Sequence, residues 1–338
     1  MFGEVEVEEA IWRTPKKSYL RALAPRLGIR PRGYSRRLEK ALTDFGCEHS
    51  FAKANRQLGE HYGFTLNPTA VREVTLRHAR RAQERLNAEY AQSFRTLPAQ
   101  GAEHVVAEAD GTMLCTVAAG ARRGRRPRLW KEMRLVAAVA QGEVAATYGA
   151  TCGDVAETGR RWGHCAKAAG WGLHSQIHTV GDGAEWVALQ SQEVFGEQGR
   201  FLLDFFHASA YLAAAAERCA PKQPAPWRRT QQRRLKRGAA ALVLAALEPH
   251  QEPPSIPDEA APVRAAHRYL RHRTSQLDYP RALRLDLPIG SGLIESGHRH
   301  VLQARLKLPG AAWLSHNADA IAQLRVLRSN NRWPLFWN

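Results

Sequence analysis

From about residue 103, short apolar runs alternate with helical patterns, and this order restricts the fold. Three runs predict strands in close succession, the first of them ending at Asp110-Gly111. Helical and apolar segments then alternate as far as residue 220. Three adjacent strands followed by alternating helices and strands predict an α/β fold around one sheet. The predicted strands are 104–114, 130–140, 143–152, 177–182 and 200–206, and the predicted helices are 155–170, a short one from Trp186, and an Ala-rich one to about residue 220.

Mostly helical sequence stands on both sides of the strands. Residues 1–99 predict an all-α N-terminal region, and residues 100–338 predict the α/β domain. Within the latter, about 213–286 are rich in Arg, Ala and Pro, which predicts a helical insertion with helices near 228–247 and 259–273. The segment EPHQEPPSIPDE separates these two helices as a linker. The insertion also carries a basic cluster, Arg228 to Arg237.

Residues 50–86 have the outline of a helix-turn-helix. Gly63 breaks the first helix, Asn67 is a good N-cap, and Pro68 occupies the first helical position of the second. Arg77, Arg81 and Arg85 then form one stripe, as in a helix that reads DNA. An ordinary helical hairpin with a solvated basic face fits the same pattern.

The charge of the chain points to a polyanionic partner. The 338 residues hold 49 Lys and Arg against 32 Asp and Glu, a net charge of +17. This excess of positive charge favours nucleic acid as the partner, with an anionic membrane surface as the second candidate. No apolar run is long enough for a transmembrane helix, and the acidic start MFGEVEVEEA is unlike a signal peptide. The five scattered cysteines include no C-x-x-C pair, so we expect a cytoplasmic protein without disulfides.

Three carboxylates stand where metal-dependent chemistry would need them. Asp110 and Asp182 each end a predicted strand and precede a glycine, and Glu295 lies in the first turn of a helix after a Gly-Ser-Gly loop. Side chains at strand ends converge on one edge of an α/β sheet. Three carboxylates there would hold two Mg²⁺ ions, for which Mn²⁺ can substitute, and such a pair promotes attack on a phosphodiester. Against this, most Asp-Gly pairs are turns, and Glu295 would also favour the positive end of its helix.

Six blocks of the sequence resemble the DDE transposases of bacterial insertion sequences, closest to the ISKra type and more distantly to Mutator-like enzymes. They follow the family's order and span about residues 50–337. The first 45 residues match poorly, and the cysteine-bearing N-terminal segment of the family is not evident. The blocks are EADGTM, WKEMRL, VGDGAEWV, LLDFFHASAYL, LPIGSGLIESGHRHVLQARLKLPGAAW and AIAQLRVLRSNNRWPLFW.

The resemblance implies a ribonuclease H-like catalytic core with a helical insertion between its second and third acids. Asp110, Asp182 and Glu295 match the catalytic, metal-binding triad of the family. The implied activity is metal-dependent cleavage of element ends, followed by joining of a 3′-hydroxyl to target DNA. The implied partners are double-stranded DNA, as terminal inverted repeats and target, and further copies of the chain. The implied location is the bacterial nucleoid.

The resemblance also suggests roles for residues outside the triad. A C-x-x-H motif follows the second acid in Mutator-like relatives, and here Asp204 and His207 occupy its two positions. His207 then orients a phosphate or a carboxylate, or pairs with Asp204 for structural reasons. Trp186 and Trp313 fit the core or base stacking. The remaining candidate DNA contacts are Arg123 and Arg126 in a basic loop, His298 and Arg299 one turn beyond Glu295, and Arg305 and Lys307.

Two other functions fit the same residues. A ribonuclease H-like nuclease would use the same metal site without strand joining. An inactive or domesticated transposase would bind DNA through the helix-turn-helix and the positive charge alone. Three convergent carboxylates argue against a pure binder, because they repel one another and DNA when no metal is bound.

Overall fold

The computed structural model describes residues 8–15, 19–21, 23–26, 33–118, 120 and 127–338. Arg123 and Arg126, two predicted DNA contacts, lie outside these residues. The chain divides into two compact units. The first unit contains residues 1–89, 114–130 and 301–338, and the second contains 90–113 and 131–300.

The second unit is built on a five-stranded mixed sheet in the order β5-β4-β3-β6-β7. The central strand β3 runs parallel to β6, and β6 runs parallel to β7, whereas β4 is antiparallel to β5. The predicted α/β class is therefore confirmed. The strands are β3 (His104–Val117), β4 (Arg128–Ala140), β5 (Thr147–Thr151), β6 (Gln176–Gly181) and β7 (Gly199–Leu203).

The two faces of β3 take part in different cores, because successive side chains of a strand point to opposite faces. Val105, Ala107 and Ala109 pack with α5 (Val155–Ala168) and α6 (Glu185–Phe195). Val106 instead joins the core cluster of the helices that follow β7. Asp110 is four residues after Val106 in the same strand, so its side chain points to the same face of the sheet as that of Val106.

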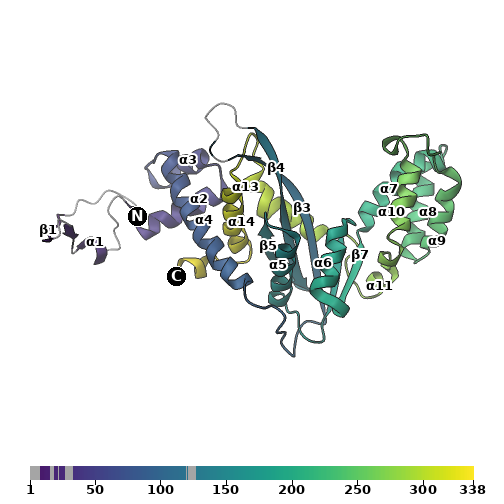
Figure 1. The fold of residues 1–338 in the computed structure, drawn as a ribbon, viewed down its shortest axis with the longest axis horizontal. Helices are drawn as coiled ribbons and strands as arrows, with labels where there is room; N and C mark the ends of the chain where they lie inside the picture. The colour runs from purple at the N-terminus through teal and green to yellow at the C-terminus, as the bar shows by residue number, and fades with distance from the viewer. Residues whose placement is uncertain (1–7, 16–18, 22, 27–32, 119, 121–126) are drawn as a thin grey trace. The chain divides into compact units, whose positions relative to one another are not determined.

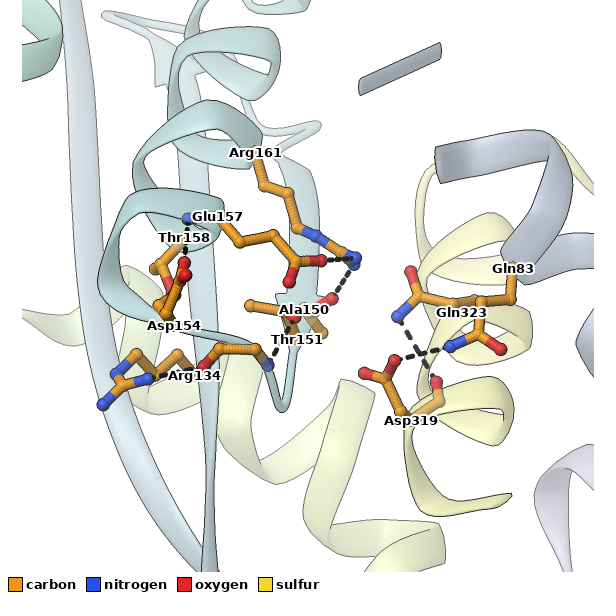
Figure 2. Close-up of polar contacts among 11 residues, drawn as sticks. Gln83, Arg134, Ala150, Thr151, Asp154, Glu157, Thr158, Arg161, Asp319 and Gln323 are labelled. Carbon is orange, nitrogen blue, oxygen red and sulfur yellow. Dashed lines mark hydrogen bonds and ion pairs between the residues drawn. The ribbon is translucent and has the colours of Figure 1, made fainter. Parts of the chain in front are cut away.

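Polar contacts fix the junction between β5 and α5, drawn in Figure 2. Asp154 caps α5 by accepting the backbone N–H of Glu157 at 2.7 Å. Arg161 is 1 % exposed and bonds both the Glu157 carboxylate and the carbonyl of Ala150. Arg134 of β4 donates to the carbonyl of Gly153 at 2.8 Å. These bonds hold the helix against the end of its strand.

The predicted helical insertion is a bundle that follows β7, green in Figure 1. Apolar residues of these helices continue the core of the second sheet face. The helix predicted over 228–247 is interrupted, because Gly238 turns the chain at a φ of +76°. The helices are α7 (Phe205–Cys219), α8 (Pro224–Lys236), α9 (Ala240–Leu247), α10 (Pro262–Arg271) and α11 (Tyr279–Arg284), with 3₁₀ turns at Glu248–His250, Asp258–Ala260 and Thr274–Gln276. Another 3₁₀ turn, Gly196–Gln198, lies between α6 and β7.

The first unit is mostly helical, but the prediction of an all-α region over residues 1–99 is wrong at its start, where β1 (Ile11–Arg13) pairs antiparallel with β2 (Tyr19–Arg21). The helices predicted around Gly63 form as α3 (Phe51–Tyr62) and α4 (Pro68–Tyr90), and Gly63 ends α3 in the left-handed region. Their apolar faces share a small core with α2 (Arg36–Glu48). In the same unit, Gln83 donates to the carboxylate of Asp319, as Figure 2 shows. The other elements are α1 (Leu23–Arg26), α13 (Ala304–Leu306), α14 (Ser315–Ser329) and α15 (Trp333–Trp337).

Two strand predictions need correction. β3 does not end at Asp110-Gly111 but continues to Val117, so Asp110 lies within the strand. The strand predicted over 200–206 ends at Leu203, because Asp204 caps the next helix. Within the described part of the chain, no helix combines the length and the apolar character needed to cross a membrane.

Candidate active site

Asp110 lies in β3 of the second unit, and Asp182 and Asp204 come directly after the parallel strands β6 and β7. Glu108 of β3 pairs with Val180 of β6, and Gly181 of β6 pairs with Leu203 of β7. Continuing these registers places Asp110 opposite Asp182, and Asp182 opposite Asp204. Neighbouring strands lie about 4.8 Å apart, so the sheet brings the three aspartates into one row.

Asp110 is held by its own strand and by a buried histidine. Its Oδ1 accepts the backbone N–H of Gly111 at 2.7 Å, and its Oδ2 lies 3.2 Å from Nε2 of His298. A side chain at Gly111 would collide with the carboxylate of Glu132, which explains the glycine after this aspartate. His298 is 4 % exposed. Its imidazole therefore lies beside the Asp110 carboxylate.

Asp182 is positioned by the helical insertion. Its Oδ1 accepts the backbone N–H of Ala184 at 2.9 Å, and its carbonyl accepts the hydroxyl of Tyr269 at 2.5 Å. Arg273 donates twice to the carbonyl of Gly183, whose φ of +86° disfavours any residue with a Cβ. Burial raises the pKa of Tyr269, so its hydroxyl stays protonated and able to donate. The insertion thus fixes the backbone that carries the second acid.

Glu295 lies on α12 (Gly292–Gly297), and a buried glutamate ties this helix to β3. Glu108 is 1 % exposed and its Oε2 accepts the backbone N–H of Ile294 at 2.7 Å. Burial raises the pKa of Glu108 to about 8, and the negative charges of Asp204 and Glu295 add to the effect. This hydrogen bond joins α12 to β3 at Glu108, two residues before Asp110. A π-helical segment, His298–Gln303, follows α12.

Asp204, His207 and Glu295 form the tightest group of candidate metal ligands. In the part of the chain that the structure describes, this is the group of three whose ligand atoms all lie within 4.8 Å of one another. Asp204 is fully buried, and both of its oxygens are already used. Oδ1 accepts the N–H groups of Phe206 and His207, and Oδ2 accepts the N–H and hydroxyl of Ser291. Asp204 therefore joins the start of α7 to the loop before Glu295, while His207 and Glu295 are exposed.

The donor set suits a hard divalent cation. Asp110 and Asp182 are half-buried, and Glu295 is exposed, so their carboxylate oxygens can be reached. Oxygen ligands of this kind are those that Mg²⁺ and Mn²⁺ prefer. Asp110 and Asp182 fall outside the tight group of Asp204, His207 and Glu295. Within the described residues, close approach of candidate ligand atoms is therefore shown for Asp204, His207 and Glu295.

The predicted DNA contacts of the first unit have intramolecular partners. Arg77 bonds Glu39, Arg81 stacks on the ring of Phe336, and Arg85 donates to the carbonyl of Leu335. Arg305 is 2 % exposed, lies between the rings of Phe51 and Trp313, and burial lowers its pKa to about 10.

The other predicted contacts differ in exposure. Arg299 of the second unit and Lys307 of the first are exposed. Trp313 is 8 % exposed, as the core interpretation expects. Trp186 is half-buried, and the guanidinium of Arg134 lies over its ring.

Sequence reasoning missed two residues that organise the site, Glu108 and Tyr269, and it missed the capping role of Asp204. Glu108 stands two positions before Asp110, and the period of a strand places both on one face, so this signal was present in EADGTM. Asp204 followed by a helical pattern carries the signature of an N-cap. Tyr269 left no local signal, because its contact with Asp182 joins residues 87 positions apart.

No protein-family model matches the chain, and no curated protein matches it either.

Proposed function

We propose that the chain is a DDE-type DNA transposase that uses Asp110, Asp182 and Glu295 to cleave DNA and to transfer a 3′-hydroxyl. The observation that carries the proposal is the equivalent register of Asp110 and Asp182 on adjacent parallel strands, with the helix of Glu295 bonded to the same β3. The strand order and the helices on both faces of the sheet agree with a ribonuclease H-like core. The net charge of +17 suits a DNA substrate.

The reaction exchanges one P–O bond for another. An oxygen of water or of a 3′-hydroxyl bonds to phosphorus, and the bridging P–O bond breaks with its electron pair on the leaving oxygen. Bound Mg²⁺ supplies neutralisation of the phosphate charge and activation of the attacking oxygen. Asp110, Asp182 and Glu295 would hold the ions.

Neighbouring residues orient the carboxylates. His298 holds Asp110, Tyr269 and Arg273 hold the backbone at Asp182, and Glu108 holds the helix of Glu295. His207 lies close enough to Glu295 to orient this carboxylate or a phosphate oxygen.

The test uses purified protein and duplex DNA whose sequence flanks the gene, so that it carries the element ends. We expect nicking and strand joining in Mg²⁺, and neither reaction with a chelator. Asp182→Ala and Glu295→Gln should each lower the rate at least ~100-fold, because each removes charge that acts on the transition state. Glu217→Gln, at an exposed position near the end of α7, is the matched control and should leave the rate unchanged.

Other outcomes assign other functions. Metal-dependent nicking without joining would identify a nuclease. Binding of the ends without nicking would identify a DNA-binding protein of transposase origin. Full activity in Asp182→Ala would remove the catalytic assignment of this row of aspartates.

A further inference from the structure

Helix α8 of the insertion lies in the segment of the second unit that has the largest excess of positive over negative residues. From Arg218 to Leu247 the chain has eight Lys and Arg and no Asp or Glu. One face of α8 is buried, with Gln231 and Leu235 in contact with the insertion core. The basic residues therefore lie on the remaining surface of the helix.

Four of these residues form what we call the α8 stripe: Arg229, Arg233, Lys236 and Arg237, all exposed. Their spacing of four, three and one residues places them on one side of the helix. At a rise of 1.5 Å per residue, Arg229 and Lys236 are about 10 Å apart along the axis. A line of cations of this length can contact several successive phosphates of one strand.

Three acidic residues of the insertion, Glu248, Glu252 and Asp258, have partners other than the stripe. Asp258 pairs with Arg264 and Arg268 at 2.9 Å, and Glu248 pairs with His267 at 2.7 Å. Glu252 accepts the backbone N–H groups at the start of α10. Among the described residues, no carboxylate lies within ion-pair distance of the α8 stripe. Its charge is therefore not neutralised within the second unit.

One end of the stripe adjoins the candidate active site. The ammonium of Lys236 lies 4.6 Å from the ring centre of Phe205, the first residue of α7. Phe205 stands between Asp204 and His207 in the chain. Lys236 thus brings one end of the stripe to the residue that directly follows Asp204.

We propose that the α8 stripe binds the phosphates of DNA next to the phosphate held at the candidate active site. This inference rests on the proposed function and names a surface that the catalytic residues do not include. A membrane surface fits less well, because the apolar residues of α8 face the insertion core and not the solvent. The exposed side offers charge without an apolar face.

The first experiment measures binding to a 30-base-pair duplex of arbitrary sequence, in chelator, by fluorescence anisotropy between 50 and 200 mM salt. Arg229→Gln with Arg233→Gln should lower the slope of log affinity against log salt by about 2, because each phosphate contact contributes about 0.9. Affinity near 100 mM salt should fall roughly 10- to 100-fold. Arg229→Lys with Arg233→Lys keeps the charge and should restore the slope.

The matched control is Arg264→Gln with Arg268→Gln, which makes the same change of formal charge in the same bundle. These arginines are paired with Asp258, so we expect an unchanged slope and a loss below about 3-fold. Equal slopes for both double variants would overturn the inference. Loss of duplex RNA binding with DNA binding intact would overturn it as well, and would assign the stripe to RNA.

A second experiment separates this inference from the proposed function. Nicking should need at least about three base pairs of flanking duplex on the stripe side, since 10 Å spans about three base-pair steps. In the Arg229→Gln, Arg233→Gln variant, removal of this flank should leave the nicking rate unchanged. Nicking by that variant with unchanged flank dependence would reject the stripe and leave the catalytic proposal standing. A reduced salt slope without any nicking would reject catalysis and leave the stripe as a DNA-binding surface.

Discussion

Single buried side chains set the response of the second unit to pH. His178 of β6 is fully buried, and its Nε2 bonds the carbonyl of Pro288 at 2.8 Å. Burial lowers the pKa of His178 from 6.5 to about 4, with smaller contributions from Arg281 and His104. The unfolded chain therefore binds a proton between pH 6.5 and 4 that the folded chain does not. The contribution of His178 to folding stability therefore falls as the pH drops through this window and is constant above it.

We expect this histidine alone to lower the free energy of unfolding by about 2 kcal/mol between pH 7 and pH 5. His178→Gln keeps a donor for Pro288 and cannot titrate, so it should remove this part of the pH dependence. Urea unfolding at the two pH values measures the difference. His174→Gln, which changes an exposed histidine, serves as the control. An unchanged pH dependence in His178→Gln would contradict the assignment.

At the scale of elements, one carboxylate joins strand β3 to helix α12. Glu108→Ala would leave the buried N–H of Ile294 without its acceptor, whereas Glu108→Gln retains an acceptor oxygen. We expect Ala to cost about 2–4 kcal/mol of stability and Gln less than about 1 kcal/mol. Urea unfolding measures both, with Glu103→Ala at an exposed position as reference. Equal losses in the two Glu108 variants would show that the contact with Ile294 does not matter.

The elements of the sheet could be predicted because apolar runs and helical spacing are local signals. The prediction that the strand ends at Asp110-Gly111 was wrong, because it relied on a dipeptide that is typical of turns. Pairing with the neighbouring strands keeps β3 extended through this dipeptide. The stripe of Arg77, Arg81 and Arg85 could be read from spacing. Its contacts with Glu39 and α15 could not, because they depend on segments far away in the chain. For the same reason, the grouping of Asp204 and His207 with Glu295 needed the structure.

At the scale of the whole molecule, each unit contains one deeply buried cysteine that reports on its opening. Cys47 of the first unit and Cys165 of the second are at most 2 % exposed, and burial raises the pKa of each from 9 to about 12. All five cysteines are free thiols. Because the thiolate is the reactive form, alkylation of these two should be on the order of 10³-fold slower than in the unfolded chain.

Pulsed alkylation at pH 8, followed by mass mapping of the peptides, gives a separate rate for each unit. We expect half-buried Cys115 and Cys152 to react before Cys47 and Cys165, and all five to react alike in strong denaturant. As denaturant is raised, the labelling of Cys47 and Cys165 measures the free energy of opening of their own units. Rapid labelling of Cys165 without denaturant would show that the core beneath α5 and α6 is not closed. The sheet that places Asp110 beside Asp182 would then lack the rigid support that catalysis requires.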